Sequence, residues 1–206
     1  MTEKAGNVGK KDPAVTIWAA DRLLAVTANP LHRQILENYR RHAILEVTAN
    51  WRDIFVPDMT VPEPVYTFDV TGLEGVKLTG DEVKEFYKSL VDQQLTVILV
   101  EDEQLMVSDW GLASESWFNT YERGSALIGR GFTGYAADGY YVMRQRLAMI
   151  WPFDSRGRLI GEHVFEAKAF QQVIEVAEDD FVTLEDAQAR LLPLLRPLPK
   201  FDPDAA

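Results

Sequence analysis

The sequence predicts an α+β domain in which a curved antiparallel sheet wraps around a long N-terminal helix. Three observations indicate this class: helical patterns dominate the first half, strand patterns run from about 96 to 170, and one more helix follows them. Helices segregated from a block of strands are typical of α+β domains rather than of alternating βαβ units. Burying the long helix inside a curled sheet leaves a cone, and the open end of the cone is a pocket.

Composition limits the classes of partner. The chain has 206 residues, of which 47% are hydrophobic and 26% are charged, as in ordinary globular domains. A formal net charge of −11 argues against nucleic acid and anionic membrane surfaces, because both require a basic footprint. The absence of cysteine excludes disulfides and zinc–cysteine sites. The N-terminus has no apolar segment typical of a signal peptide, so we expect a cytoplasmic protein.

One domain is expected to include most of the chain. Residues 1–12 are polar and are expected to be disordered, and residues 196–206 are expected to form a proline-rich tail. The remaining residues, 13–195, are predicted to form a single domain with its core at about 30–170 and its last helix at about 183–195.

The long helix is predicted at about 30–47. Asn29 is suited to the N-cap and Pro30 to the first helical position. Apolar side chains recur every four residues along it, at Leu31, Ile35, Tyr39, Ala43 and Val47. This stripe predicts one buried face. Shorter helices are predicted at 13–27 and 50–55.

Two further helices are predicted from capping boxes, in which side chains satisfy the first backbone N–H groups. Thr79 and Glu82 form one such pair before an amphipathic segment, and Thr183 and Asp186 form the other. Between these helices the pattern is that of strands. Strands are predicted at 96–100 leading into 104–109, at 112–121, at 140–153 and at 158–170, with a tight turn at 154–157.

Glu63 lies between two prolines, at the point where a helical pattern changes to a strand pattern. Proline fixes its own φ and holds the preceding residue in extended geometry, so Glu63 is on a stiff backbone. A carboxylate on such a segment is either an acid in a solvated turn or a group held toward a pocket. The segment alone does not decide between these alternatives.

The order of these elements resembles the NTF2-like superfamily, which includes ketosteroid isomerases, SnoaL-type polyketide cyclases and small dehydratases. The segments that carry the resemblance are the helix with Tyr39, then 51–64, then 80–87, and the hairpin at 151–160. The resemblance implies the cone-shaped fold. It leaves the reaction open, because the same fold hosts isomerases, dehydratases, cyclases, hydrolases and proteins that only bind a ligand.

The resemblance also implies roles for individual residues. Glu63, before Pro64, matches the general base of the ketosteroid isomerases, and Tyr39 matches the tyrosine that donates a hydrogen bond to the substrate oxygen. Those isomerases also use a neutral aspartic acid as a second donor, and the matching position in this sequence is Met149. A methionine cannot donate a hydrogen bond, so the sequence departs from the isomerase pattern at this point.

The last strand presents Glu162, Val164 and Glu166 on one face by its alternation. The resemblance places this face toward the cavity, which makes Glu162 a candidate acid or second carboxylate. The alternative is that the strand has the opposite phase and these acids are exposed. Other candidates for contact with a substrate are His42, Trp117, Asn119, Gln145 and Met149. Aromatic residues and methionines at strand spacing are also typical of an ordinary core.

Neither a cofactor nor a metal ion is expected. Residues 129–134 match the pattern G-x-G-x-x-G, but a strand follows them, whereas a dinucleotide site requires a helix. The glycine-rich segment instead suggests a connection that could cover the pocket. The three histidines, His32, His42 and His163, have no spacing typical of metal ligands.

Two functions remain open from the sequence. The first is a cofactor-independent isomerase, dehydratase or cyclase that moves protons on a hydrophobic carbonyl or hydroxyl compound, such as a steroid, polyketide or terpenoid. The second is a module that binds a small hydrophobic molecule, or dimerises, without chemistry. In both cases we expect a homodimer with a small hydrophobic molecule as its partner.

Overall fold

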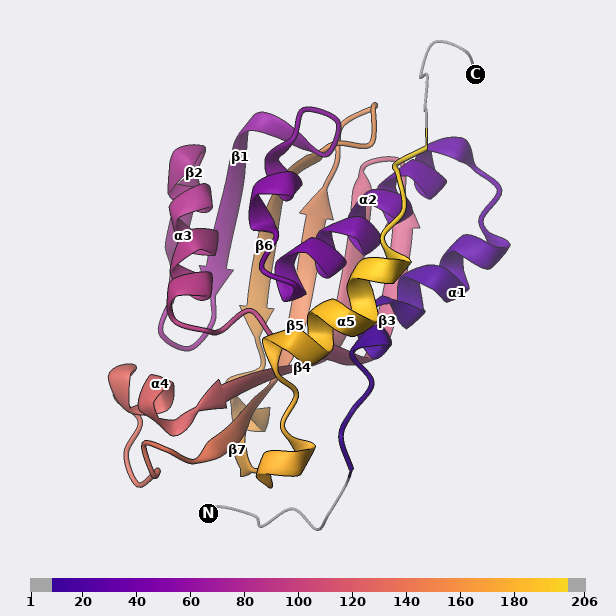
Figure 1. Cartoon of the computed structure of the whole chain (residues 1–206). Helices are drawn as coiled ribbons and strands as arrows, with labels where there is room; N and C mark the ends of the chain where they lie inside the picture. The colour runs from indigo at the N-terminus through magenta and orange to yellow at the C-terminus, as the bar shows by residue number, and fades with distance from the viewer. Residues whose placement is uncertain (1–8, 200–206) are drawn as a thin grey trace.

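The computed structural model describes residues 9–199, in which helices pack on one side of a strongly bent sheet (Figure 1). The predictions of disorder and of a tail at the two ends fall largely on residues 1–8 and 200–206, which lie outside the described residues. None of the described helices is both long enough and apolar enough to cross a membrane.

The helices agree with the predicted segments, except that the short α4 was not predicted and the last helix ends in a 3₁₀ turn. The α-helices are α1 (Trp18–Val26), α2 (Pro30–Val47), α3 (Asp81–Asp92), α4 (Gly124–Gly129) and α5 (Leu184–Leu191). Short 3₁₀ helices occupy Pro13–Ile17, Trp51–Phe55, Lys168–Phe170, Glu178–Asp180 and Leu192–Leu194. The helix predicted at 30–47 is confirmed, and the Asn29 side chain accepts a hydrogen bond from the His32 N–H at 3.2 Å.

The sheet confirms the α+β class but is mixed rather than wholly antiparallel. Its strands are β1 (Thr60–Asp69), β2 (Val76–Thr79), β3 (Ile98–Ser108), β4 (Gly111–Arg123), β5 (Tyr140–Pro152), β6 (Leu159–Glu166) and β7 (Gln172–Glu175). The order is β2-β1-β6-β5-β4-β3, and β7 pairs with β5 beside β6. Strands β1 and β6 are parallel, which corrects the expectation. No hairpin joins these two strands, so their connection does not require an antiparallel pair.

The inner face of the sheet carries the main core. Helix α2 crosses this face together with α5, while α3 lies beside β1 and β2 (Figure 1). Along β5, Met149 pairs with Ser114 of β4 and with Val164 of β6, so these three residues form one row across the sheet. Buried side chains from α2, such as Ile35 and Tyr39, cover this row.

One of the two predicted capping boxes is complete. At α5, Thr183 and Asp186 make both reciprocal hydrogen bonds. At α3, Glu82 still accepts from the Thr79 N–H at 2.9 Å, but the N-cap is Gly80, which has a φ of 53° and no side chain to cap with. The left-handed conformation at this junction favours glycine, and it moves the helix start one residue beyond the prediction.

The G-x-G-x-x-G segment has no dinucleotide-binding context. Its first glycine ends α4, and the following residues lead into β5, which is antiparallel to β4. A nucleotide fold would instead place a helix after the glycines and a parallel strand beyond it.

Asn38 connects the long helix to two segments that are distant in sequence. Its side-chain amide donates to the Met59 carbonyl at 2.7 Å and to the Gly157 carbonyl at 2.9 Å, and the residue is buried. These bonds join α2 to the start of β1 and to the turn between β5 and β6. The same amide therefore fixes the position of both strands relative to the helix.

Replacing Asn38 by alanine should destabilise the protein by about 2–4 kcal/mol, because two buried carbonyl groups would lose a donor. Urea unfolding followed by circular dichroism measures this loss. The exposed Gln172→Ala serves as a control and should change stability by less than about 0.5 kcal/mol. Equal effects of the two substitutions would show that Asn38 does not hold the strands to the helix.

Candidate functional site

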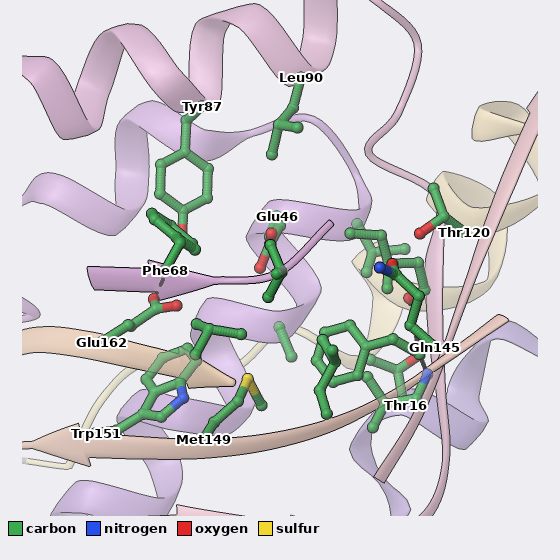
Figure 2. A pocket seen from close by; sticks show the side chains of 18 of the residues that line it. Thr16, Glu46, Phe68, Tyr87, Leu90, Thr120, Gln145, Met149, Trp151 and Glu162 are labelled. Carbon is green, nitrogen blue, oxygen red and sulfur yellow. Dashed lines mark hydrogen bonds between the residues drawn. The ribbon is translucent and has the colours of Figure 1, made fainter. Parts of the chain in front are cut away.

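A largely apolar pocket lies between the inner face of the sheet and helices α2 and α3 (Figure 2). Its cavity volume is about 160 Å³, comparable to cavities that bind a benzene-sized molecule. The apolar lining includes Phe68, Val70, Leu73, Phe86, Leu90, Phe118, Leu147, Met149, Trp151 and Val164. The polar residues in the lining are Thr16, Tyr39, Glu46, Tyr87, Thr120, Gln145 and Glu162.

Glu162 is the most buried carboxylate of the pocket wall, at 6% exposure. It comes from β6, and Tyr87 of α3 points toward it from the opposite side (Figure 2). The Tyr87 hydroxyl donates to Glu162 Oε1 at 3.3 Å, and the same hydroxyl lies 2.7 Å from His42 Nε2. His42 therefore lies behind Tyr87 and Glu162, fully buried on α2.

His42 is neutral in this environment. Burial lowers the pKa of His42 to about 3, so its contacts with carboxylates are not ion pairs at neutral pH. The Nε2 atom of His42 shares a hydrogen with the Tyr87 oxygen, and the Nδ1 atom has no partner among the described residues.

Glu46 supplies a second carboxylate to the same part of the pocket. It lies one turn beyond His42 on α2, and its Oε2 atom is 3.7 Å from His42 Nε2, while Glu162 Oε1 is 3.5 Å from that nitrogen. The Glu46 side chain is 23% exposed, but it opens into the pocket rather than into bulk water. Two carboxyl groups thus flank one neutral imidazole.

Both carboxyl groups hold protons more tightly than in water. Burial raises the pKa of Glu46 to about 7. Burial also raises the pKa of Glu162 well above its usual range, and the nearby charge of Glu46 raises it further. Two like charges in an apolar site disfavour simultaneous ionisation, so the pair carries a proton near neutral pH.

Tyr39 makes a separate pair with Glu103 of β3. The Tyr39 hydroxyl donates to Glu103 Oε1, and both residues are buried. The Tyr39 ring also meets Trp151 edge to face, with 5.1 Å between the ring centroids. In this arrangement the hydroxyl hydrogen of Tyr39 is held by Glu103 and not by a group inside the pocket.

The mouth of the pocket continues toward the glycine-rich connection. A second hollow shares Phe86, Leu90 and Gln145 with the first one and adds Arg130 and Phe132 from this connection. Arg130 donates to both oxygens of the buried Glu122, which lies on β4. The connection is therefore held at the mouth by an ion pair, in the place where the sequence suggested a cover.

Several candidates from the sequence lie in the pocket wall. They are Tyr39, Gln145, Met149, Glu162 and Val164. These residues of β5 and β6 therefore lie on the face that was expected. The alternative in which Glu162 is exposed is excluded, because Glu162 lies in the pocket wall. Glu166, on the same strand, lies outside the lining, which is a correction: its carboxylate accepts from the Thr71 N–H at 2.6 Å and from Gln171 at 2.9 Å.

The expectation that Glu63 faces the pocket is wrong. Glu63 is exposed on β1, and its carboxylate lies beside Gly80, at the start of α3. Side chains alternate along a strand, and in β1 the inward positions are Pro64, Tyr66 and Phe68. Glu63 is one residue out of phase with them, so its side chain points to solvent.

Trp117 and Asn119 also lie outside the pocket. The inward residues of β4 in this region are Phe118 and Thr120, so the predicted phase is off by one residue. Trp117 instead stacks with Arg144, 4.4 Å from its ring, and Asn119 donates to the Leu99 carbonyl at 3.1 Å. The outer face of β4 is partly covered by other side chains, so burial on both faces obscures the alternation.

His42 contacts the polar cluster but does not line the pocket, which corrects its assignment as a substrate contact. The sequence analysis missed Glu46, Tyr87, Glu103 and Trp151. Glu46 could have been found, because it is seven residues after Tyr39 and an acid on a buried helical face is unusual. Glu103 could not have been found, because its orientation depends on an irregularity in β3.

The histidines do not come together in the part of the chain from 9 to 199. No group of three or more histidine or acidic residues there has the arrangement of a metal site. The three histidines are dispersed: His32 contacts Asp109, His42 lies behind the pocket wall, and His163 bonds to Thr67 on the outer face.

Comparison with protein-family models and with curated proteins gives no match. Solved structures do show similarity of fold. An NTF2-like protein from Anabaena variabilis is 11% identical, with a TM-score of 0.49, and the match covers 75% of this chain and 96% of that one. It belongs to the superfamily that the sequence resembles.

Two other solved structures are similar over comparable lengths. A phenazine biosynthesis-related protein from Pseudomonas aeruginosa is 12% identical, with a TM-score of 0.46, covering 84% of this chain and 92% of that one. A CaMKII hub from S. rosetta is 18% identical, with a TM-score of 0.44, covering 69% of this chain and all of that one. At these identities the similarity concerns the fold alone.

The raised pKa of Glu162 predicts how stability depends on pH. The folded state holds this proton more tightly than the unfolded state, so the stabilisation is complete below the unfolded pKa and is lost as pH rises through the folded pKa. We expect the free energy of unfolding to fall less steeply between pH 5 and pH 8 in Glu162→Gln than in the parent protein. One proton contributes at most about 1.4 kcal/mol per pH unit.

Chemical denaturation at several pH values measures this difference in slope. His42 is present in both the parent protein and Glu162→Gln, so its contribution to the pH dependence cancels when the two proteins are compared. Glu115→Gln, at an exposed position of β4, is the matched control and should retain the parent slope. Identical slopes for the parent and Glu162→Gln would contradict the raised pKa.

Proposed function

We propose that this protein is a cofactor-independent isomerase, dehydratase or cyclase that moves protons on a hydrophobic carbonyl or hydroxyl compound. The observation that carries the proposal is the pair of carboxyl groups, Glu46 and Glu162, at one end of an apolar pocket. Steroid-, polyketide- and terpenoid-like molecules have the apolar surface that this lining favours, and the open mouth leaves room for the part of the molecule that the cavity does not enclose.

The pair can supply both a base and an acid at neutral pH. One carboxylate removes a proton from the carbon next to a carbonyl group, and the protonated carboxyl returns a proton to another carbon or to a leaving hydroxyl. Because the two groups share a desolvated site, the pKa of Glu162 is raised well above its usual range and that of Glu46 is raised to about 7, so the pair has both a proton to donate and a carboxylate to accept one near neutral pH.

Tyr87 and His42 hold Glu162 in place. The hydrogen-bond chain from His42 Nε2 through the Tyr87 hydroxyl ends on Glu162 Oε1, which fixes one oxygen. The other oxygen is then the one available to a substrate. The neutral imidazole adds no charge, so it orients the carboxyl without lowering its basicity by a salt bridge.

Replacing Glu162 by glutamine should reduce catalysis about 10²- to 10⁴-fold, since glutamine keeps the shape but transfers no proton. The reaction to measure is exchange of the methyl protons of 2-acetylnaphthalene in D₂O, followed by NMR, because this ketone is apolar and enolisable. The reduction should fall on kcat, with KM little changed.

Glu63→Gln is the matched control for this experiment, because Glu63 is an exposed glutamate on the neighbouring β1. It should exchange the ketone protons at the parent rate. A loss in Glu63→Gln with an unchanged rate in Glu162→Gln would overturn the proposal.

The alternative, a module that binds a hydrophobic ligand without chemistry, uses the same pocket. Ala43 of α2 lines it, so Ala43→Phe should fill the space and weaken binding of 2-acetylnaphthalene at least tenfold, as measured by fluorescence titration. Ala189→Phe, on the exposed side of α5, should bind as the parent does. Binding by the parent without exchange would favour the module over the enzyme.

The homodimer and the cytoplasmic location expected from the sequence stay predictions and belong to the same proposal. A dimer would suit the outer face of the sheet, where Met106, Ile150 and Phe165 are exposed. Sedimentation velocity decides the oligomeric state.

A further inference from the structure

Glu103 is a buried carboxyl that the proposed reaction leaves unused. We infer that Glu103 is a positioning residue for Tyr39: its carboxyl decides whether the Tyr39 hydroxyl hydrogen is held by Glu103 or offered to an oxygen atom of a ligand in the pocket. This inference rests on the proposed small-molecule function of the pocket. It adds that the preferred ligand carries a hydrogen-bond acceptor, such as a ketone or quinone oxygen, near Tyr39.

An irregularity in β3 turns Glu103 inward. Before it, Val100 pairs with Phe118 and lines the pocket, and after it Leu105 pairs with Ser114. The register shifts between these pairs, at a bulge in which Asp102 has a φ of 53°. Regular alternation from Val100 would place Asp102 inward and Glu103 outward, so the bulge is what brings Glu103 rather than Asp102 under α2.

The position is otherwise suited to an apolar side chain. The neighbouring inward positions of β3 hold Ile98, Val100 and Leu105, and Glu103 is only 6% exposed. Burying a carboxyl in such a place is unfavourable unless the group is neutral or hydrogen-bonded. A left-handed aspartate in the bulge adds backbone strain. A regular strand would avoid the left-handed residue but would turn Asp102 inward, whereas the bulge directs the longer Glu103 to Tyr39, which argues that the Tyr39–Glu103 pair has a role beyond packing.

Tyr39 and Glu103 lie on opposite sides of the wall that separates the pocket from the protein surface. Tyr39 lines the pocket, whereas Glu103 lines a surface groove between α1 and β3. Glu103 can therefore exchange its proton with solvent through the groove, without passing a ligand in the pocket. The charged groups that line this groove are Lys11 of the N-terminal segment, Arg22 of α1, Glu101 and Asp102 of β3, and Arg144 of β5.

The two protonation states of Glu103 direct the Tyr39 hydrogen differently. An ionised Glu103 can only accept, so it holds the hydrogen of Tyr39, as observed. A protonated Glu103 can donate to the Tyr39 oxygen, which frees the Tyr39 hydrogen for a ligand. Burial raises the pKa of Glu103 to about 7, although Tyr39, Ser114 and Arg22 act in the opposite direction, so both states are populated near neutral pH.

The first test is a titration of Glu103 without ligand, by ¹³C NMR of the side-chain carboxyl groups, assigned with Glu103→Gln. We expect a midpoint near pH 7 for Glu103 in the parent protein. In Tyr39→Phe the midpoint should rise, because the carboxylate loses a donor that stabilises its ionised form. A midpoint below 5 in the parent, or no change in Tyr39→Phe, would overturn the inference.

The second test measures the vibration and the affinity of a bound ligand. The carbonyl stretch of bound 2-acetylnaphthalene, measured by infrared spectroscopy, should move to lower frequency between pH 8.5 and pH 5.5 as Tyr39 begins to donate to it. The affinity should rise about fivefold over the same range, which is the effect of one additional neutral hydrogen bond. In Glu103→Gln and in Tyr39→Phe the carbonyl frequency should be independent of pH, and the affinity should keep only the pH dependence that Glu46 and Glu162 impart.

The controls separate this inference from the proposed function. Glu115→Gln, on the exposed face of β4, should behave as the parent. A shift that persists in Tyr39→Phe would come from Glu46 or Glu162 and would contradict the role of Glu103. Failure of the parent to bind the ketone would contradict the proposed function. The titration of Glu103, which needs no ligand, would then be the test that decides the role of Glu103.

Discussion

Removing a carboxyl group from water is unfavourable for its ionised form, and the space between α2 and the sheet holds Glu46, Glu103 and Glu162 largely away from water. Their surroundings reduce this cost in different ways. Glu162 accepts from Tyr87, Glu103 accepts from Tyr39, and Glu46 opens into the pocket. The packing of α2 against the sheet depends on these arrangements, since α2 contributes a partner or a carboxyl to each of them.

The pocket and the core are therefore built from the same elements. Trp151 shows this directly: its ring packs edge to face on Tyr39 and on His42, with centroid distances of 5.1 and 4.8 Å, and it also lines the pocket. Its indole N–H is buried without a partner among the described residues. Apolar packing fixes the rings, and the rings in turn fix the polar atoms at their edges. A rigid site of this kind is suited to proton transfer, which requires short and constant distances.

Strand phase decided which sequence predictions succeeded. Along β5 and β6 the alternation of Gln145, Leu147, Met149 and Val164 is regular, and these residues lie in the pocket, although Glu166, which was predicted with them, does not. Along β4 both faces are partly covered, so Trp117 and Asn119 were assigned to the wrong face. In β1 the prolines make the backbone around Glu63 rigid, but they do not indicate which face of the sheet the Glu63 side chain occupies. A one-residue error reverses every side chain in a strand.

The sequence by itself determined the α+β class and the bounds of the long helix, because periodicity and capping are local properties that act through near neighbours. Alternation placed Glu162 and Val164 on one face, but only the resemblance assigned that face to the cavity. Only the tertiary structure decided the carboxyl pairs. Glu46 meets Glu162 from a distant part of the chain, and Tyr39 meets Glu103 only because a bulge in β3 changes the phase of that strand. Such pairings depend on how distant segments dock, and the solvation of each carboxyl follows from that docking.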